Sequence, residues 1–374
     1  MDLYLPNEIL FQILIRLPVK ALVRFRCVSK FWYSRIGKSK FMLSHLHHNQ
    51  VANSNVLFRK YLSDCKTEIY SLHSDNQEFQ EIETLDFPFK CADNYFSIIG
   101  CVNGLICLWD KISTALVFWN PSIRKYVTLP KFSLEPAMKM NKRMRLHWNP
   151  TVVRDMCFGF GYDALSNDYK AIRMIFYEET DELGNDAVKC SVSVFTLLRR
   201  SWRSLDYNAP LRMYSRSCNV GGFVYRLTTV IGDNRLEIVS FDLSTEVFTE
   251  MACPDEVRFV ARCTPELTIY CDSLALLHEW DYKRYHIWVM KEDDGAKSWM
   301  KLFSVDLDGG VSGQRIVGFS MKGLMLVVGE GNLLVSPAEK DAQVVKYVPH
   351  VPQSAWHVES YQGSLVLLKE PNRE

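Results

Sequence analysis

Three groups of residues have types and spacings that could support chemistry. His45, His47 and His48 are close enough in sequence to bind a metal ion, and Gly-x-Gly motifs at residues 159–161 and 329–331 could approach a phosphate. Histidine ligands usually come with a second ligand cluster, which this sequence lacks, and both motifs lack the third glycine of a dinucleotide loop. We therefore interpret the histidines as a solvated helix end and the glycines as turn residues.

Other catalytic signatures are missing. The sequence has no Gly-x-Ser-x-Gly elbow, no Walker-type lysine loop, no Cys-x-x-Cys pair and no motif that places two carboxylates together. It therefore predicts no catalytic residue, no cofactor and no metal site. Polar side chains that project into the axis of a propeller could still form an enzyme site that spacing does not reveal.

Composition restricts the class of protein. With 374 residues, the chain fits one small and one large domain, and 48% hydrophobic residues predict well-packed cores. A formal net charge of +1 provides no bulk basic field for nucleic acid or an anionic membrane. The N-terminus does not resemble a signal peptide, no apolar run is long enough to span a bilayer, and the eleven cysteines show no regular spacing. We expect reduced thiols and a cytoplasmic or nuclear protein.

The N-terminal segment, residues 4–46, predicts three short helices. Apolar residues recur there at three- and four-residue spacing, at Ile9, Leu10, Ile13, Leu14 and Leu17. Pro6 suits a first helical turn and Pro18 ends that helix, Leu22 and Phe25 mark a second helix, and Ser29 can cap a third. Three helices are too few to bury their own apolar surface well, so a partner should cover the remainder.

A repeating unit follows: an aromatic residue that ends an apolar run, a polar turn, and a second aromatic that starts another run. The first positions are Tyr70, Trp119, Phe195, Phe241, Trp288 and, in the same register, Val335; their partners are Phe79, Tyr126, Trp202, Phe248, Trp299 and Val345. Successive first positions lie 49, 76, 46, 47 and 47 residues apart. Four of the five intervals match one propeller blade, which predicts about six four-stranded blades. A β-sandwich is the alternative.

Loop insertions at residues 131–155 and 178–188 would explain the long interval. The first repeat lacks an upstream half and the last half-repeat, residues 356–369, lacks a downstream pair, so both chain ends should close one blade. Residues 55–60 and 364–370 then compete for one strand position.

Two stretches are nearly the same sequence. YCDSLALL spans residues 270–277 and YQGSLVLL spans residues 361–368. This self-similarity supports an internal repeat and predicts the same local structure at both places.

The N-terminal segment resembles a plant-type F-box. The matching residues are Leu5-Pro6, Ile9-Leu10, Ile13-Leu14, Arg16-Leu17-Pro18, Lys20-Ala21-Leu22, Arg24 to Val28, Lys30, Trp32 and Phe41. It departs from the usual pattern at Ser29, where cysteine is usual, and at Phe31, where serine is usual; neither change breaks the apolar face.

The rest of the chain resembles the kelch-like F-box-associated domain of plant F-box proteins. The matching stretches are residues 102–110, 118–130, 158–174 and 286–303, and the whole layout resembles the S-locus F-box and S-locus F-box-like family. True kelch repeats differ, since only one diglycine occurs, at residues 221–222. We thus expect a mainly β protein with a small α domain. A three-helix F-box should span residues 1–48, and a kelch-like β-propeller of about six blades, complete or incomplete, should span residues 49–374.

This resemblance implies a substrate-recognition adaptor of a Skp–cullin–F-box ubiquitin ligase, which needs no catalysis of its own. The F-box would bind a Skp-type adaptor, and through it the cullin and RING subunits, while propeller loops bind a target protein for ubiquitination and degradation. Neither nucleic acid nor membrane is an expected partner. The positions implied to face the Skp-type adaptor are Leu5, Pro6, Ile9, Leu10, Leu14, Pro18, Leu22 and Val28, although some of them must hold the helices together.

Two charged segments are candidate target-binding loops, because propellers bind partners with loops at the ends of their sheets. The first is basic, with Lys139, Lys142, Arg143 and Arg145 beside Trp148, and the second is acidic, with Glu178, Glu179, Asp181 and Glu182. Plain solvated loops are the simpler interpretation of both.

Three further functions remain open at this point. The protein could be an F-box interaction protein that acts outside a cullin ligase, or a propeller enzyme with an unrelated helical N-terminus. Within the ligase hypothesis, the S-locus resemblance raises a role in pollen self-incompatibility, with a style ribonuclease as the target.

Overall fold

The computed structural model describes most of the chain. The described residues are 6–49, 55–62, 67–76, 78–89, 96–111, 113–131, 151–180, 186–207, 211–213, 217–230, 235–258, 265–281, 284–293, 295–307, 315–329, 332–337, 346–348 and 357–368. They divide into two compact units, which we call the terminal unit (Met1–Thr128 with Leu307–Glu374) and the central unit (Leu129–Asp306).

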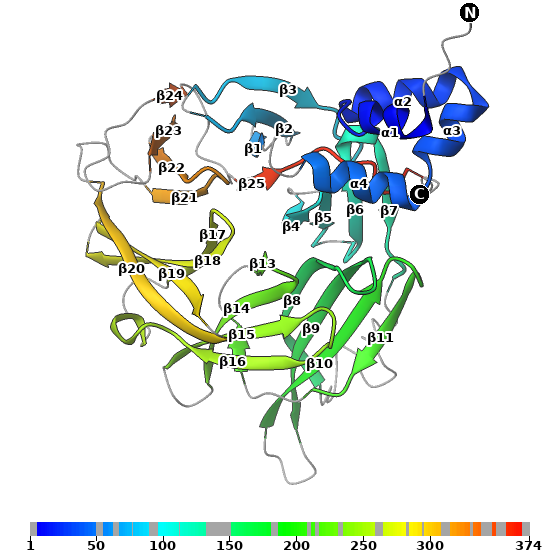
Figure 1. The fold of residues 1–374 in the computed structure, drawn as a ribbon. Coiled ribbons are helices and arrows are strands. Elements are labelled where there is room, and N and C mark those ends of the chain that lie inside the picture. The colour runs from blue at the N-terminus through cyan, green and yellow to red at the C-terminus, as the bar shows by residue number, and fades with distance from the viewer. Residues whose placement is uncertain are drawn as a thin grey trace, which may run out of the picture. The chain divides into compact units, whose positions relative to one another are not determined.

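Four helices lie among the described residues at the start of the terminal unit, one more than the sequence predicted (Figure 1). They are α1 (Asn7–Leu14), α2 (Val19–Val28), α3 (Lys30–Ile36) and α4 (Ser39–Asn49). Pro18 precedes α2, and the Ser29 hydroxyl caps α3 by accepting the Trp32 backbone N–H at 3.2 Å, as expected. The predicted proline break and serine cap are therefore both present.

Three antiparallel sheets complete the terminal unit, each with four strands in up-and-down order. The first contains β25 (His357–Tyr361), β1 (Asn55–Leu62), β2 (Thr67–Ser74) and β3 (Glu81–Leu85). The second contains β4 (Ser97–Val102), β5 (Leu105–Trp109), β6 (Leu116–Asn120) and β7 (Lys125–Thr128), with the short 3-10 turn η1 (Pro121–Ile123) before β7. The third contains β21 (Arg315–Phe319), β22 (Leu324–Gly329), β23 (Asn332–Pro337) and β24 (Lys346–Val348).

The central unit also contains three antiparallel sheets. The first contains β8 (Thr151–Asp163), β9 (Asp168–Thr180), β10 (Asp186–Thr196) and β11 (Ser201–Leu205). In the second, β12 (Leu211–Met213) and β13 (Cys218–Val220) both pair with β14 (Phe223–Val230), which is followed by β15 (Leu236–Asp242) and β16 (Phe248–Ala252). The third contains β17 (Glu266–Tyr270), β18 (Ser273–Asp281), β19 (Arg284–Asp293) and β20 (Ala296–Asp306), and a 3-10 turn, η3 (Asp255–Val257), follows β16.

These six sheets among the described residues confirm the predicted fold class, a small helical domain followed by six propeller blades. They do not form the two stacked sheets that a β-sandwich requires. The predicted use of both chain ends is also confirmed, because β1 pairs with β25 from Asn55 opposite Tyr361 to Arg59 opposite His357.

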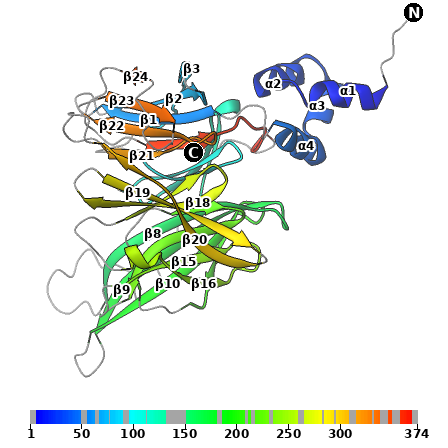
Figure 2. The same ribbon diagram turned by 60° about the vertical axis from the view of Figure 1, so that its left-hand side comes forward.

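The competition for one strand position has a clear outcome. Residues 55–60 lie in β1 of that sheet and residues 357–361 form its fourth strand, whereas residues 364–368 are not strand. Residues 365–368 form a turn in which Leu368 N–H donates to the Leu365 carbonyl at 3.0 Å. Residues 273–277 of the similar stretch lie in β18. The prediction that both stretches share one local structure is therefore wrong. Figures 1 and 2 show the last described residues, drawn red, leaving β25 toward the helices.

The repeated aromatic position has a structural meaning: the first residue of every predicted pair lies on the third strand of its sheet. Direct cross-strand pairs form as predicted between Trp119 and Tyr126, between Phe195 and Trp202, and between Phe241 and Phe248. Tyr70 instead pairs with Leu85, Trp299 with Met290 and Val335 with Lys346, while Val345 lies outside the described residues.

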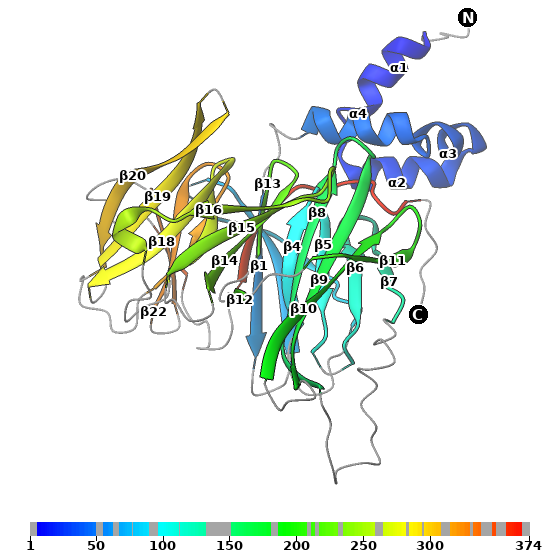
Figure 3. The same ribbon diagram turned by 90° about the horizontal axis from the view of Figure 1, so that it is seen from below.

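Two further predictions need correction in the central unit. Residues 178–180 and 186–188 of the second predicted insertion are strand residues at the ends of β9 and β10, and residues 151–155 of the first belong to β8 (Figure 3). The glycines at 159 and 161 lie in β8 rather than in a turn. A Cβ on Gly161 would lie 2.1 Å from Asn219 Nδ2, so glycine at this position permits β8 to approach β13 closely.

Candidate functional site

The helices share one apolar core with the last described residues of the chain. Its buried members are Leu14, Ile15, Val19, Leu22, Ile36, Phe41, Leu365 and Leu368. Polar groups close its edge: Asn49 Nδ2 donates to the Ile15 carbonyl at 3.1 Å, and His45 Nε2 donates to the Leu17 carbonyl at 2.9 Å. The inner faces of the helices are therefore already covered within the chain.

His45 differs from the predicted solvated histidine. Its side chain is buried, and burial lowers its pKa below the ordinary value. His47 and His48 are exposed, as expected. His45 follows Phe41 by four residues, and the two rings stack with their centroids 6.2 Å apart. This helical spacing was the signal in the sequence that places His45 on the inner face.

Two exposed apolar strips remain on the outer side of the helices. The α1 strip consists of Ile9 and Ile13, which lie one turn apart and are 47% and 46% exposed. Together with the stems of their polar neighbours, they line a shallow depression. This strip belongs to a helix whose opposite face is buried, which leaves it available to a partner.

The α2–α3 strip is the second exposed apolar surface. It consists of Phe25, Val28, Phe31 and Tyr33, with Val28 72% exposed. The rings of Phe25 and Phe31 both contact the ring of Trp32, with centroids 6.2 and 5.0 Å apart, which joins the two phenylalanines. Soluble proteins rarely leave such clustered aromatics uncovered without a binding role.

The eight positions implied to face a Skp-type adaptor separate into three groups. Pro6, Ile9, Pro18 and Val28 are exposed, and Leu10 is half-buried. Leu14 and Leu22 are buried in the helix core, so they hold the helices together. Leu5 lies outside the described residues. Ile13, Phe25 and Phe31 are exposed apolar residues that this set omitted, although the i, i+4 spacing of Ile9 and Ile13 indicated one of them.

The candidate target-binding loops lie largely beyond what the structure describes. Lys139, Lys142, Arg143, Arg145 and Trp148, and also Asp181 and Glu182, lie outside the described residues. Glu178 and Glu179 are backbone members of β9 and pair on both sides, with β8 and with β10. Those two glutamates therefore belong to a central strand rather than to a free loop.

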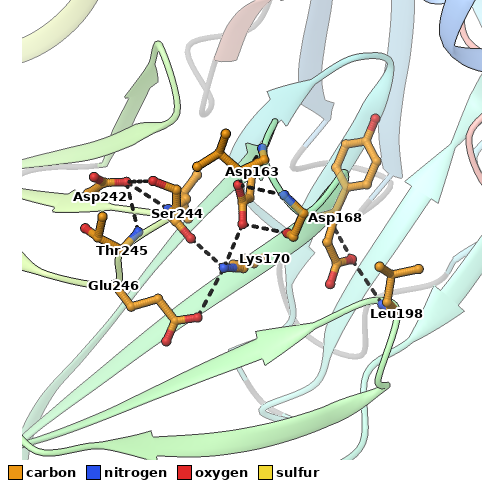
Figure 4. A network of polar contacts seen from close by, with 12 residues as sticks. Asp163, Asp168, Lys170, Leu198, Asp242, Ser244, Thr245 and Glu246 are labelled. Carbon is orange, nitrogen blue, oxygen red and sulfur yellow. Dashed lines mark hydrogen bonds and ion pairs between the residues drawn. The ribbon is translucent and has the colours of Figure 1, made fainter.

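A buried polar cluster in the central unit most resembles catalytic machinery (Figure 4). Lys170 Nζ lies 2.9 Å from Asp163 Oδ2 and 3.1 Å from Glu246 Oε1, and it donates to the Leu243 carbonyl at 2.5 Å. Asp163 also accepts the Ser166 hydroxyl at 2.5 Å. Because each charged group already has close partners within the protein, the cluster ties β8 and β9 to the loop after β15.

Metal binding and membrane spanning find no support among the described residues. No group of three His, Cys, Asp or Glu side chains there could hold a metal ion. No helix in that part of the chain is long and apolar enough to cross a bilayer.

Comparison with known proteins identifies both parts of the chain. The F-box domain profile matches residues 3–44, and the profile of the F-box associated beta propeller domain matches residues 55–354. The chain is 29% identical to F-box protein CPR1 of Arabidopsis thaliana over 324 residues, which covers 80% of this chain and 73% of that protein. It is 26% identical to the F-box/kelch-repeat protein At3g23880 of the same plant over 318 residues, which covers 80% and 79%. The chain therefore belongs to the F-box proteins with an F-box associated beta propeller domain.

Proposed function

We propose that this protein is the substrate-recognition adaptor of a Skp–cullin–F-box ubiquitin ligase. The F-box, residues 1–48, binds a Skp-type adaptor and through it the cullin and RING subunits. The propeller domain, residues 49–374, binds a target protein, which is then ubiquitinated and degraded. The observation that carries the proposal is the pair of exposed apolar strips on helices whose inner faces are already buried.

The surface chemistry suits a protein partner. Covering the exposed half of Ile9 and of Ile13 would contribute about 1 kcal/mol each, and Val28 somewhat more, since full burial of such side chains contributes about 1.5–3 kcal/mol. Arg26 and Arg35 lie over the rings of Tyr33 and Phe31, at 4.2 and 4.7 Å, which keeps the aromatic groups ordered. An apolar centre with a polar rim is the usual composition of a binding hot spot.

The proposed role needs no catalytic group in this chain. Ubiquitin transfer in such a ligase gains its rate from holding the target near a charged conjugating enzyme, which is a matter of effective concentration and orientation. F-box adaptors are generally non-catalytic, and the internal contacts of the Lys170 cluster agree with a structural role there. Cytoplasm and nucleus are the compartments where this activity would operate.

Target recognition is proposed for the charged segments around residues 139–148 and 178–182. Glu178 and Glu179 lie in a paired strand, so acidic recognition is proposed for Asp181 and Glu182, which lie outside the described residues. Capture of targets with the proteasome inhibited would identify the partner, and a style ribonuclease would be the prey that supports a self-incompatibility role. Capture of proteins whose turnover does not respond to cullin inhibition would indicate a role outside the ligase.

Adaptor binding is tested by placing charge on the exposed strips. Ile9→Asp and Val28→Asp, singly and together, should leave folding intact because both side chains are exposed. Calorimetry with a purified Skp-type adaptor should show at least a tenfold loss of affinity for each single variant and at least a hundredfold loss for the pair, because a carboxylate buried in an apolar contact has no partner. Leu198→Asp, at an equally exposed leucine of the central unit (70%), is the matched control and should bind normally. Unchanged affinity in the double variant would sink the proposal.

A further inference from the structure

The chain end forms part of the helix core. After β25, residues Gln362–Leu368, which we call the terminal clasp, run along the helices of the terminal unit. Leu365 and Leu368 are 1% and 6% exposed and belong to the same core as Leu14, Leu22 and Ile36. This contact joins residues more than 300 positions apart in the sequence.

Polar contacts hold the clasp on both sides. Toward the helices, Gln362 Nε2 donates to the Leu46 carbonyl at 2.9 Å. Toward the sheet β4–β7, the fully buried Asn120 donates from Nδ2 to the carbonyls of Ser364, at 3.1 Å, and Val366, at 2.8 Å. Lys125 Nζ donates to the Leu368 carbonyl at 3.2 Å. The clasp therefore bridges the helices and the sheet with hydrogen bonds that a frayed chain end would not make.

Two glycines show how closely the clasp is fitted. A Cβ on Gly104, in the turn between β4 and β5, would lie 2.2 Å from the Gln362 carbonyl oxygen. A Cβ on Gly363 would lie 3.0 Å from Ser122 Oγ and 3.6 Å from Val19 Cγ2. At Gly104 the Gln362 carbonyl leaves no room for a side chain, and at Gly363 the Ser122 hydroxyl would have to move by a few tenths of an ångström. The backbone of the clasp therefore lies close to both neighbours.

We propose that the terminal clasp is an integral part of the adaptor-docking domain, and that it positions the F-box helices on the sheets of the terminal unit. This inference rests on the proposed function, since it makes binding of the Skp-type adaptor depend on residues 362–368. Four short helices cannot bury their apolar inner faces alone, and Leu365 and Leu368 supply the missing cover. The exposed Lys20–Glu83 ion pair, at 2.5 Å, also links α2 to β3, but exposed pairs of this kind contribute little.

The main test removes the apolar contact and measures two properties. The double variant Leu365→Ala, Leu368→Ala should accelerate amide hydrogen exchange in α1–α4 at least tenfold. It should also weaken binding of a purified Skp-type adaptor at least tenfold, because the helices are in the binding arrangement in a smaller fraction of the molecules. The matched control is Leu267→Ala in β17, which is 6% exposed like Leu368 but packs in a sheet of the central unit. That control should leave exchange in α1–α4 and adaptor affinity unchanged.

A second pair of variants separates steric displacement from backbone strain. Gly104→Ala introduces both the clash with Gln362 and a side chain at φ +73°. Gly295→Ala introduces a side chain at φ +81° with no described residue within 4 Å of the new Cβ. Only Gly104→Ala should accelerate exchange in the clasp and the helices.

The outcomes distinguish this inference from the proposed function. If the unmodified chain binds no Skp-type adaptor, the proposed function fails, while the exchange data still decide whether the clasp supports the helices. Wild-type exchange in the double-leucine variant, or accelerated exchange with unchanged adaptor affinity, would overturn the inference. If the double-leucine variant does not fold, the Gly104→Ala variant provides the test. Hydrogen exchange in its helices no faster than in Gly295→Ala would then overturn the inference.

Discussion

Lys170→Met is the most informative perturbation of the propeller interior. Lys170 comes from β9 and reaches Asp163 at the end of β8 and Glu246 in the loop after β15 (Figure 4). Its side chain is 7% exposed, and that of Asp163 is 2% exposed. Methionine fills a similar volume and removes the charge, so the variant isolates the electrostatic contribution from packing.

The expected loss is about 3–5 kcal/mol in free energy of unfolding, because removing one partner of a buried ion pair leaves a carboxylate without its counter-charge. The lower half of that range is favoured, since Asp163 keeps its bond from the Ser166 hydroxyl and Glu246 keeps its ion pair with Arg203. Asp163→Asn should lose less, because the amide oxygen still accepts from Lys170.

Urea unfolding followed by circular dichroism measures the effect, with equal m-values required for a fair comparison. Lys291→Met, at an exposed lysine of β19, is the matched control and should change stability by no more than about 0.5 kcal/mol. A loss below about 1 kcal/mol for Lys170→Met would refute the assignment of a structural tie.

The pH dependence has a defined sign. Burial alone would raise the pKa of Asp163, but hydrogen bonds from Ser166 and Lys170 hold that pKa below its ordinary value of 3.8. Burial alone would lower the pKa of Lys170, but Asp163 and Glu246 hold it above 10.5. A lowered carboxylate pKa contributes stability above 3.8 that is lost as the pH falls further, and a raised lysine pKa contributes stability that is lost at pH above 10.5. The wild-type advantage over Lys170→Met should therefore be flat from pH 5 to 9 and shrink in acid.

Three further predictions concern single residues. Cys27 is exposed on α2 while burial raises the pKa of the Cys107 thiol, so iodoacetamide should label Cys27 before Cys107. Bound Skp-type adaptor should slow the labelling of Cys27 at least fivefold, as measured by mass spectrometry. Asn120→Ala should lower the free energy of unfolding by about 1–3 kcal/mol, because the buried clasp carbonyls lose their donor; a thermal melt identical to wild type would contradict this. Gly161→Ala should lower the free energy of unfolding by about 1–3 kcal/mol through its clash with Asn219, and the unfolding midpoint should move to a lower urea concentration. An unchanged midpoint would show that β13 moves to accommodate the new side chain without cost.

The helical segment shows how far local patterns reach. Proline at 18 predicted the break after the first helix and serine at 29 predicted the cap of α3, because both act through the backbone of their immediate neighbours. The same patterns did not separate the outward from the inward apolar positions. Leu14 is buried and Ile13 is exposed, a difference that depends on what packs against the helix.

The repeat pattern predicted the sheets for a similar reason. An aromatic residue recurs on the third strand of five of the six blades, and Val335 takes the position in the sixth. Each of these strands lies between two others of its sheet, so its side chains are buried at a fixed interval in the sequence. Exact partners were less predictable. Trp299 pairs with Met290 because the hairpin between β19 and β20 sets its register with Asp293 opposite Ala296, and the aromatic spacing in the sequence does not reveal which residues form that turn.

The sequence by itself determined the amphipathic helices of the N-terminal segment, the six-blade repeat and the closing of one blade by both chain ends, since each depends on local periodicity or on counting halves of a repeat. The F-box itself was expected from the resemblance of that segment to the family. Only the tertiary structure determined the backbone conformations of SLALL at residues 273–277 and SLVLL at residues 364–368. The first is strand, and the second contains a turn whose leucines complete the helix core. The local propensity of the two stretches is nearly equal, so their neighbours decide the conformation. Residues 273–277 lie between β17 and β19, whereas residues 364–368 meet the uncovered faces of α1–α3.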